Sequence, residues 1–188
     1  MAGINLAKIN KNSNFKTSLN EEPCIFLSHS SFDKDKVEKI NEYITQEWNI
    51  NTYFDKEDND LQSAVDEGCA EKITACIEKG ISNSVHLMCI YSSNTVRSWW
   101  VSYEVGYAKK SSTIEGSKIK GIATLKLKGD DVCLPSFLEN NNILDIKSLD
   151  EYLEKLNKNR PMHNFVDTNH PLNNYMDWNV THEIQTAF

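Results

Sequence analysis

The segment at residues 84–94 reads SVHLMCIYSSN. Residues 85–91 are almost all apolar, which is typical of a central strand that is buried on both faces of a parallel sheet. The polar residues 92–94 that follow indicate a loop at the end of that strand. A strand of this kind needs helices on both sides of its sheet, so the flanking sequence should alternate between helices and further strands.

The flanking sequence does alternate in this way. Four more short apolar runs predict strands, at residues 24–27, 52–54, 119–124 and 143–146. Apolar residues at helical spacing predict four helices: one beginning after Asp33, which could cap it, and others at 65–80 (closed by Gly80), about 95–110 and 149–156. The expected fold is therefore α/β, a doubly wound sheet of five parallel strands with helices on both faces.

The same pattern predicts the domain organisation. Residues 22–158 carry the alternating strands and helices and should form one domain. Residues 1–21 are polar and rich in Asn and Lys, so we expect a flexible N-terminal extension. Residues 159–188 contain two prolines and a weak helical pattern, and the sequence does not assign a structure to this C-terminal tail.

The composition narrows the classes of function. The chain has 188 residues and a formal net charge of −7, so no nucleic acid or membrane partner is expected. No apolar run approaches the ~20 residues of a membrane span, and the polar start lacks a secretory signal, so we expect a cytoplasmic location. The absence of G-x-G-x-x-G and Walker A motifs argues against an ordinary hydride-transfer or P-loop protein.

Metal binding is not expected from the sequence. His163, His170 and His182 lack the spacing of metal ligands. The acidic stretch from Asp55 resembles a calcium loop, but the turn glycine and the twelfth-position glutamate of such loops are absent. A cysteine–histidine nucleophile pair stays open, because nothing marks out one of the five cysteines.

The predicted third helix contains a carboxylate in an unusual place. Within SWWVSYEVGYA, residues 98–108, Glu104 lies inside an apolar arc when the helix is wound at ~100° per residue. A carboxylate in that position is costly unless it is paired or partly solvated in a cleft. The pattern alone leaves two interpretations open: a functional carboxylate, or a structural charge pair or rim position with Arg97 as a strained partner.

Four segments together resemble the TIR (Toll/interleukin-1 receptor) domain family, in order and in spacing. They are CIFLSHSSFDKDKV at 24–37, TYFDKEDNDL at 52–61, SVHLMCIYSSN at 84–94 and SWWVSYEVGYA at 98–108. The resemblance covers residues 22–158 and implies the flavodoxin-like TIR fold. The Trp-x-x-x-Glu pattern of Trp100 and Glu104 is similar to that of TIR members that cleave NAD+.

The resemblance implies a site in which NAD+ is the substrate and no separate cofactor is needed. Glu104 would be the catalytic residue, and Trp100 would form an apolar wall unless it only packs in the core. Ser30, Ser31 and Phe32 in the loop after the first strand would contact the nucleotide. The structural alternative for this loop is helix capping by Ser30, Ser31 or Asp33, and Asp55 would either contact substrate or begin a turn.

The resemblance also implies a biological setting. The chain resembles the stand-alone bacterial TIR proteins of the Thoeris anti-phage defence, which make a cyclic or conjugated ADP-ribose signal that a separate effector binds. Self-association is expected through the 55–65 loop, with Leu61 exposed at its tip. The main alternative is a TIR–TIR adaptor without catalysis. A deoxyribosyl-transfer or base-exchange enzyme on a related fold fits the motifs less well.

Overall fold

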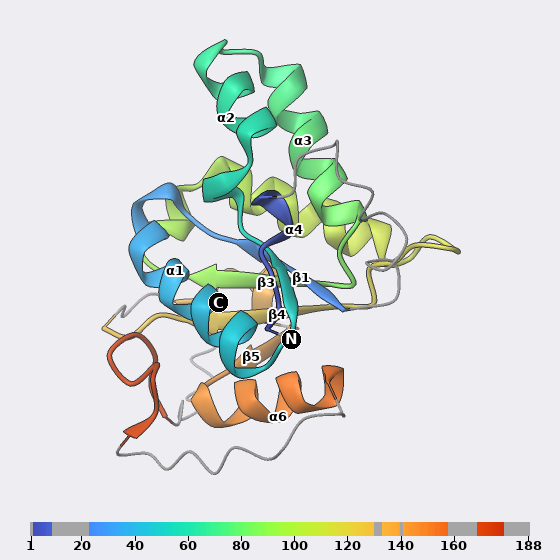
Figure 1. Cartoon of the computed structure of the whole chain (residues 1–188). Coiled ribbons are helices and arrows are strands. Elements are labelled where there is room, and N and C mark those ends of the chain that lie inside the picture. The colour runs from blue at the N-terminus through green and yellow to red at the C-terminus, as the bar shows by residue number, and fades with distance from the viewer. Residues whose placement is uncertain (1, 9–22, 130–132, 140, 158–168, 179–188) are drawn as a thin grey trace.

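The computed structural model describes residues 2–8, 23–129, 133–139, 141–157 and 169–178. Its centre is one sheet of five parallel strands, as predicted (Figure 1). The strands are β1 (Cys24–Ser28), β2 (Asn51–Tyr53), β3 (His86–Tyr91), β4 (Gly121–Lys126) and β5 (Asn142–Leu144). They lie in the order β2-β1-β3-β4-β5, so β1 and β3 occupy the middle of the sheet.

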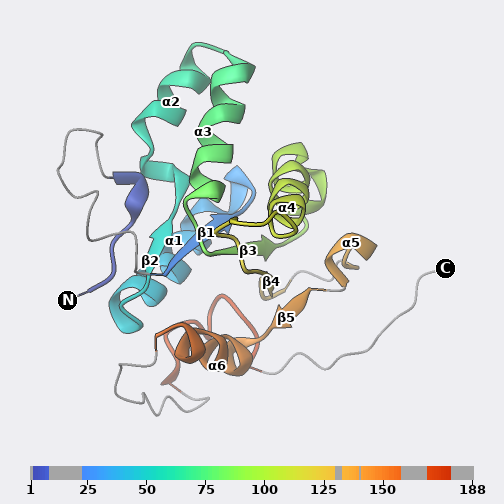
Figure 2. The ribbon, with the colours of Figure 1, turned by 90° about the vertical axis from the view of Figure 1, so that its right-hand side faces the viewer.

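Helices cover both faces of this sheet. They are α1 (Lys34–Glu42), α2 (Asn59–Asp66), α3 (Ala70–Ser82), α4 (Trp99–Ser111), α5 (Ser136–Glu139) and α6 (Ile146–Leu156). Short 3-10 or π turns are η1 (Leu6–Lys8), η3 (Ser31–Asp33), η4 (Tyr43–Glu47), η5 (Asp55–Glu57) and η6 (Thr95–Arg97). Figure 2 shows α2, α3 and α4 on one side of the sheet and α6 on the other. Within the described residues, no helix is both long and apolar enough to cross a membrane.

The alternation of side chains along each strand divides the interior into two cores. In β1, Ile25 and Leu27 join the core formed with α1 and α6, whereas Phe26 joins the core formed with α3 and α4. Ser28 follows Phe26 by two residues, so its side chain points toward α4. This alternation of side chains between the two faces decides which residue at the end of β1 can contact α4, the third of the predicted helices.

The structure corrects three predicted boundaries. The predicted helix at 65–80 is two helices, separated at Gly68, whose φ of +63° favours glycine. Gly80 does not end α3, which continues to Ser82; a Cβ at Gly80 would lie 2.8 Å from the Tyr53 ring. The predicted 55–65 loop is mostly η5 and α2, and the short helix α5 was not predicted at all.

The described part of the N-terminal extension lies along the edge of the sheet. Residues 2–8 run beside β2, where Asn5 bridges to Thr52 in parallel. The Asn5 amide donates to the Phe54 carbonyl and accepts from the Phe54 N–H, both at 3.0 Å. One side chain thereby replaces the backbone partners that an edge strand lacks. The remainder of the predicted extension, 9–21, lies outside the described residues.

Part of the C-terminal tail also packs on the domain. Leu172 and Met176 belong to the core on the α1 and α6 side. His170 is buried, and its Nε2 lies 2.9 Å from the hydroxyl of Tyr43. The Tyr43 hydroxyl in turn donates to Asp150 at 2.6 Å. Residues 159–168 and 179–188 lie outside the described part of the chain.

Replacing Asn5 tests whether the N-terminal segment supports the fold. We expect Asn5→Ala to lower the free energy of unfolding by about 2 kcal/mol, because it leaves two buried backbone groups of Phe54 without partners. Urea unfolding measures the change, with Asn142→Ala as the control because Asn142 is exposed. Equal stability of the two variants would show that the segment contributes nothing.

Candidate functional site

The candidate site lies at the carboxyl edge of the sheet, where β1, β2 and β3 end. Ser28 ends β1, Asp55 follows β2, and Ser92 follows β3. Loops at this edge of an open α/β sheet are the usual place for ligands. The site is therefore built from segments that are far apart in the sequence and that the parallel topology brings together.

Helix α4 brings a carboxylate to this edge. Its buried residues are Val101, Glu104, Val105 and Ala108, which share one face of the helix at the spacing expected for a core-facing stripe. Ser98 caps the start of the helix, where its side chain accepts a hydrogen bond from the Val101 N–H. Glu104 is 7% exposed and occupies a position where an apolar residue would normally lie. A glutamate in such a stripe is destabilising unless it has a partner.

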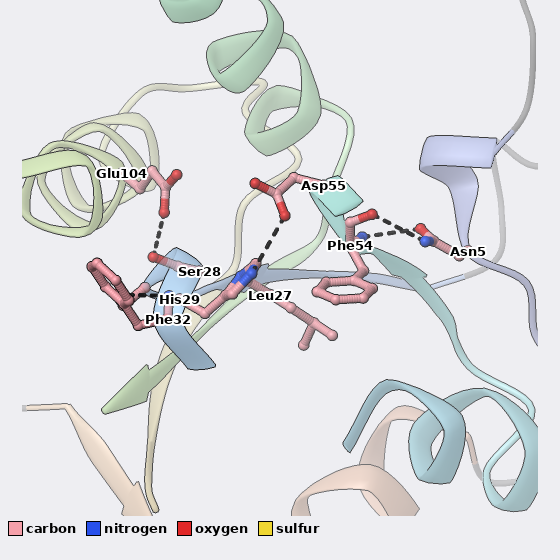
Figure 3. A network of polar contacts seen from close by, with 9 residues as sticks. Asn5, Leu27, Ser28, His29, Phe32, Phe54, Asp55 and Glu104 are labelled. Carbon is pink, nitrogen blue, oxygen red and sulfur yellow. Dashed lines mark hydrogen bonds and ion pairs between the residues drawn. The ribbon is translucent and has the colours of Figure 1, made fainter. Parts of the chain in front are cut away.

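The partner of Glu104 is Ser28. The Ser28 hydroxyl donates a hydrogen bond of 2.5 Å to Glu104 Oε2. Figure 3 shows this bond above the end of β1. Arg97, the partner considered from the sequence, is exposed in η6, whereas Glu104 is buried. Neither the charge-pair interpretation nor the rim interpretation of Glu104 matches this environment.

Burial changes the acidity of Glu104. The pKa of Glu104 is raised from 4.5 to about 8, chiefly by loss of water; the hydrogen bond from Ser28 opposes this increase, and the nearby charge of Asp55 adds to it. Cys89 on β3 is close enough to respond: burial raises the pKa of its thiol, and the charge of Glu104 adds to that increase. Perturbation of this size by burial and a specific neighbour is typical of functional carboxylates.

Asp55 lies beside His29, the residue that follows Ser28. His29 Nε2 lies 3.4 Å from Asp55 Oδ1, and His29 Nδ1 lies 2.9 Å from the carbonyl of Leu27. A carbonyl only accepts, so His29 Nδ1 is the donor in that hydrogen bond. The His29 ring also packs against Phe54, with centroids 5.2 Å apart. Ser28, which ends β1, and His29, which follows it, thus each lie next to one of the two carboxylates (Figure 3).

The loop after β1 is fixed from within. Ser30 is buried and caps η3 by accepting from the Phe32 N–H, so the capping alternative describes its side chain. Ser31 and Phe32 are exposed, Phe32 to 85%. Asp33 precedes α1 without capping it. Its carboxylate instead accepts hydrogen bonds from Ser92, at 2.5 Å, and from Asn94, and so ties this loop to the one after β3.

The aromatic residues of α4 do not enclose Glu104. Trp99 is 90% exposed, and Trp100 is 41% exposed with its ring edge-on to Tyr103. Trp99 therefore points into solvent and does not shield Glu104 from water. Glu104 is buried on the face of α4 that packs over the sheet. Trp100 lies at the rim of the site, where part of its side chain is exposed to solvent and part is covered.

Two residues of the site were missed by the sequence analysis. Ser28 and His29 were assigned to a loop, although their position directly after an apolar strand is a recognisable signal. Strand parity places Ser28 on the same face as Phe26. Only the packing of α4 over β1 shows that this face meets Glu104.

Replacing Glu104 should stabilise the fold at high pH. The unfolded chain loses the Glu104 proton near pH 4.5 and the folded chain near pH 8, so wild-type stability falls as pH rises between these values. Glu104→Gln removes this loss. We expect its melting temperature to exceed that of the wild type by about 4 °C or more above pH 8, from the ~2–4 °C per kcal/mol of a chain this size. Below about pH 4.5 the two proteins should melt together. A constant difference at all pH values would contradict a buried, neutral Glu104.

Comparisons with known proteins agree with this geometry. Residues 25–158 match the TIR domain, a range that extends from β1 to the end of α6 and includes every site residue described above. A comparison with curated proteins finds no match. The matched range covers most of the chain, and the sheet has the all-parallel order of a doubly wound α/β fold. The chain belongs to the TIR domain family.

Proposed function

We propose that this TIR domain cleaves the bond between nicotinamide and ribose in NAD+, with Glu104 as the catalytic residue. The observation that carries the proposal is the burial of Glu104 at the carboxyl edge of the sheet, on a helix stripe that otherwise holds only apolar and small residues. A fold without catalysis gains nothing from a carboxylate there, because burying it costs stability. Some TIR domains cleave NAD+ and others act as adaptors, so the family alone does not decide between them.

The chemistry of NAD+ suits a single carboxylate. Nicotinamide leaves as a neutral molecule and needs no general acid, unlike the leaving groups of most glycosidases. The departing bond leaves positive charge on the ribose ring. Glu104, hydrogen-bonded to the ribose hydroxyls, would stabilise that charge in a site from which water is excluded. Ser28 and Asp55 lie close enough to influence the same carboxylate.

The protonation of Glu104 fits this role. Without substrate, a pKa of about 8 keeps much of Glu104 neutral at pH 7. The positive charge of the bound nicotinamide ring would favour the ionised form, since an opposite charge nearby lowers the pKa of a carboxyl group. Binding of a cation would thus produce the carboxylate at the place where it is needed.

Other residues at the edge would bind the rest of the substrate. Ser31 and Phe32 are exposed in the loop after β1, and Trp100 lies at the rim one turn before Glu104. We assign Phe32 and Trp100 to contacts with the flat rings of NAD+, since aromatic faces stack on such rings. Ser30 would act indirectly by shaping the loop, and Asp55 would meet the substrate beside Glu104.

We further propose that the product is a cyclic or conjugated ADP-ribose and that it acts as a signal in anti-phage defence. Cleavage would draw on cytoplasmic NAD+, and a separate effector would bind the product. This role rests on the resemblance of the sequence to the Thoeris TIR proteins. The chemistry requires that a second nucleophile reach the ribose before water does, which a buried catalytic group favours.

Replacing Glu104 tests the activity. We expect Glu104→Gln to reduce NAD+ cleavage by ~10²-fold or more, as the loss of one electrostatic stabiliser does in other enzymes. The assay follows NAD+ loss in lysates of phage-challenged cells that express the chain, with mass spectrometry to identify the products. Glu154→Gln on the exposed face of α6 is the matched control. Full activity of Glu104→Gln would refute the assignment, and linear ADP-ribose as the only product would refute the signal.

Self-association is the second part of the proposal. The 55–65 segment was expected to expose Leu61, but Leu61 is only 4% exposed and packs in the core beside α3 and α4. Val65, at 52%, is the exposed apolar residue of α2. We therefore assign the contact between copies to the surface around Val65. Phe32 and Trp99 are also exposed, which favours a contact surface and keeps an adaptor without catalysis as the second candidate.

A surface substitution tests this contact. If copies assemble through α2, NAD+ cleavage should rise faster than linearly with protein concentration, and Val65→Asp should reduce it ~10-fold by burying a charge in the contact. Ile114→Asp is the control, because Ile114 is similarly exposed at 55% and lies outside α2. Activity that is strictly proportional to concentration, with no difference between the variants, would indicate a self-sufficient monomer.

A further inference from the structure

We propose that Ser28 is a positioning residue for the reaction: its hydroxyl fixes the orientation of Glu104 and favours the ionised carboxylate. The inference rests on the proposed cleavage of NAD+ by Glu104, which it deepens. Ser28 would not touch the reacting bond and would act only through Glu104.

The burial of Ser28 and the direction of its hydrogen bond indicate that its hydroxyl acts on Glu104. Its side chain is fully buried, and its hydroxyl has one proton, which it donates to Glu104 Oε2 at 2.5 Å. Ser28 belongs to β1 in the middle of the sheet, which is anchored on both sides by β2 and β3. A donor on such a rigid element can hold a carboxylate more firmly than a donor on a loop. Within the described residues, Ser28 provides the hydrogen bond that Glu104 receives.

The sheet under α4 leaves room for this arrangement. Ser28 lies opposite Cys89 of β3, and Cys89 lies opposite Thr124 of β4. These three small side chains form a row at the same level of the sheet, all of them buried. Leu87 and Phe26, two positions earlier in their strands, are large and fill the core. The Glu104 side chain can therefore reach the sheet at this level, because the side chains in the row are small.

Ser28 also opposes the two effects that keep Glu104 neutral. Burial and the charge of Asp55 raise the pKa of Glu104, whereas the hydrogen bond from Ser28 lowers it. A hydroxyl that donates to a carboxylate stabilises the ionised form more than the neutral form. The proposed reaction uses the ionised form, so removing the hydroxyl should cost more activity at neutral pH than at high pH.

The test is the pH dependence of the full-length Ser28→Ala variant. We expect its profile of kcat/KM for NAD+ cleavage, which reports the ionisation of the free enzyme, to move to higher pH by about one unit and kcat/KM at pH 7 to fall ~10-fold. Ser84→Ala is the matched control. Ser84 is equally buried and donates to the Gly80 carbonyl at 2.9 Å, away from the site, so its loss should leave the profile unchanged.

A second measurement needs no enzymatic activity. The infrared band of the protonated Glu104 carboxyl, identified by its absence in Glu104→Gln, can be followed against pH in the free protein. Ser28→Ala should titrate at higher pH than the wild type. Ser28→Cys, with a weaker donor of similar size, should shift in the same direction by less and serves if the alanine variant does not fold.

The outcomes separate this inference from the proposed function. Unshifted infrared titration in Ser28→Ala, or in Ser28→Cys where the alanine variant does not fold, would overturn the role of Ser28. A uniform loss of activity at all pH values, with no infrared shift, would show a purely structural serine and would overturn it too. If the wild type cleaves no NAD+, the proposed function fails, and the infrared titration still decides whether Ser28 controls Glu104.

Discussion

The hydrogen bond between Ser28 and Glu104 joins the middle of the sheet to the helix that covers it, and the rest of the site is arranged around it. A carboxylate in the buried stripe of α4 would destabilise the domain without a polar partner. That partner comes from the strands beneath the stripe, and in this structure it is Ser28 at the end of β1. The constraint explains why a small polar residue, and not another large apolar one, ends β1.

The neighbouring contacts keep this edge of the sheet rigid. Asp33 joins the loops after β1 and β3 through Ser92 and Asn94. Asn5 holds the backbone of Phe54 from the outer edge of β2, directly before Asp55. The two carboxylates are therefore each positioned by residues from other segments. A site that needs a particular separation between charged groups benefits from such support, since small displacements weaken catalysis.

The fold was predictable because its strands are buried on both faces. Residues 85–91 are apolar without alternation, which a central parallel strand requires and an exposed strand does not. Glu104 was predictable as a functional candidate because a charge interrupts an apolar helix arc. Its partner was not, because Ser28 is 76 residues away in sequence and meets Glu104 only after α4 packs over β1. The exposure of Leu61 was predicted wrongly because the acidic residues around it suggest a loop. Helix α2 instead places the Leu61 side chain in the core.

The most direct test of the central claim is a structure of the Glu104→Gln variant with intact NAD+ bound. We expect the side chain at position 104 to lie within hydrogen-bonding distance of the hydroxyls of the ribose that carries nicotinamide, with Ser28 still bonded to it. We also expect Phe32 and Trp100 beside the rings of the substrate. A structure in which NAD+ binds away from this edge, or with that ribose out of reach of position 104, would contradict the account.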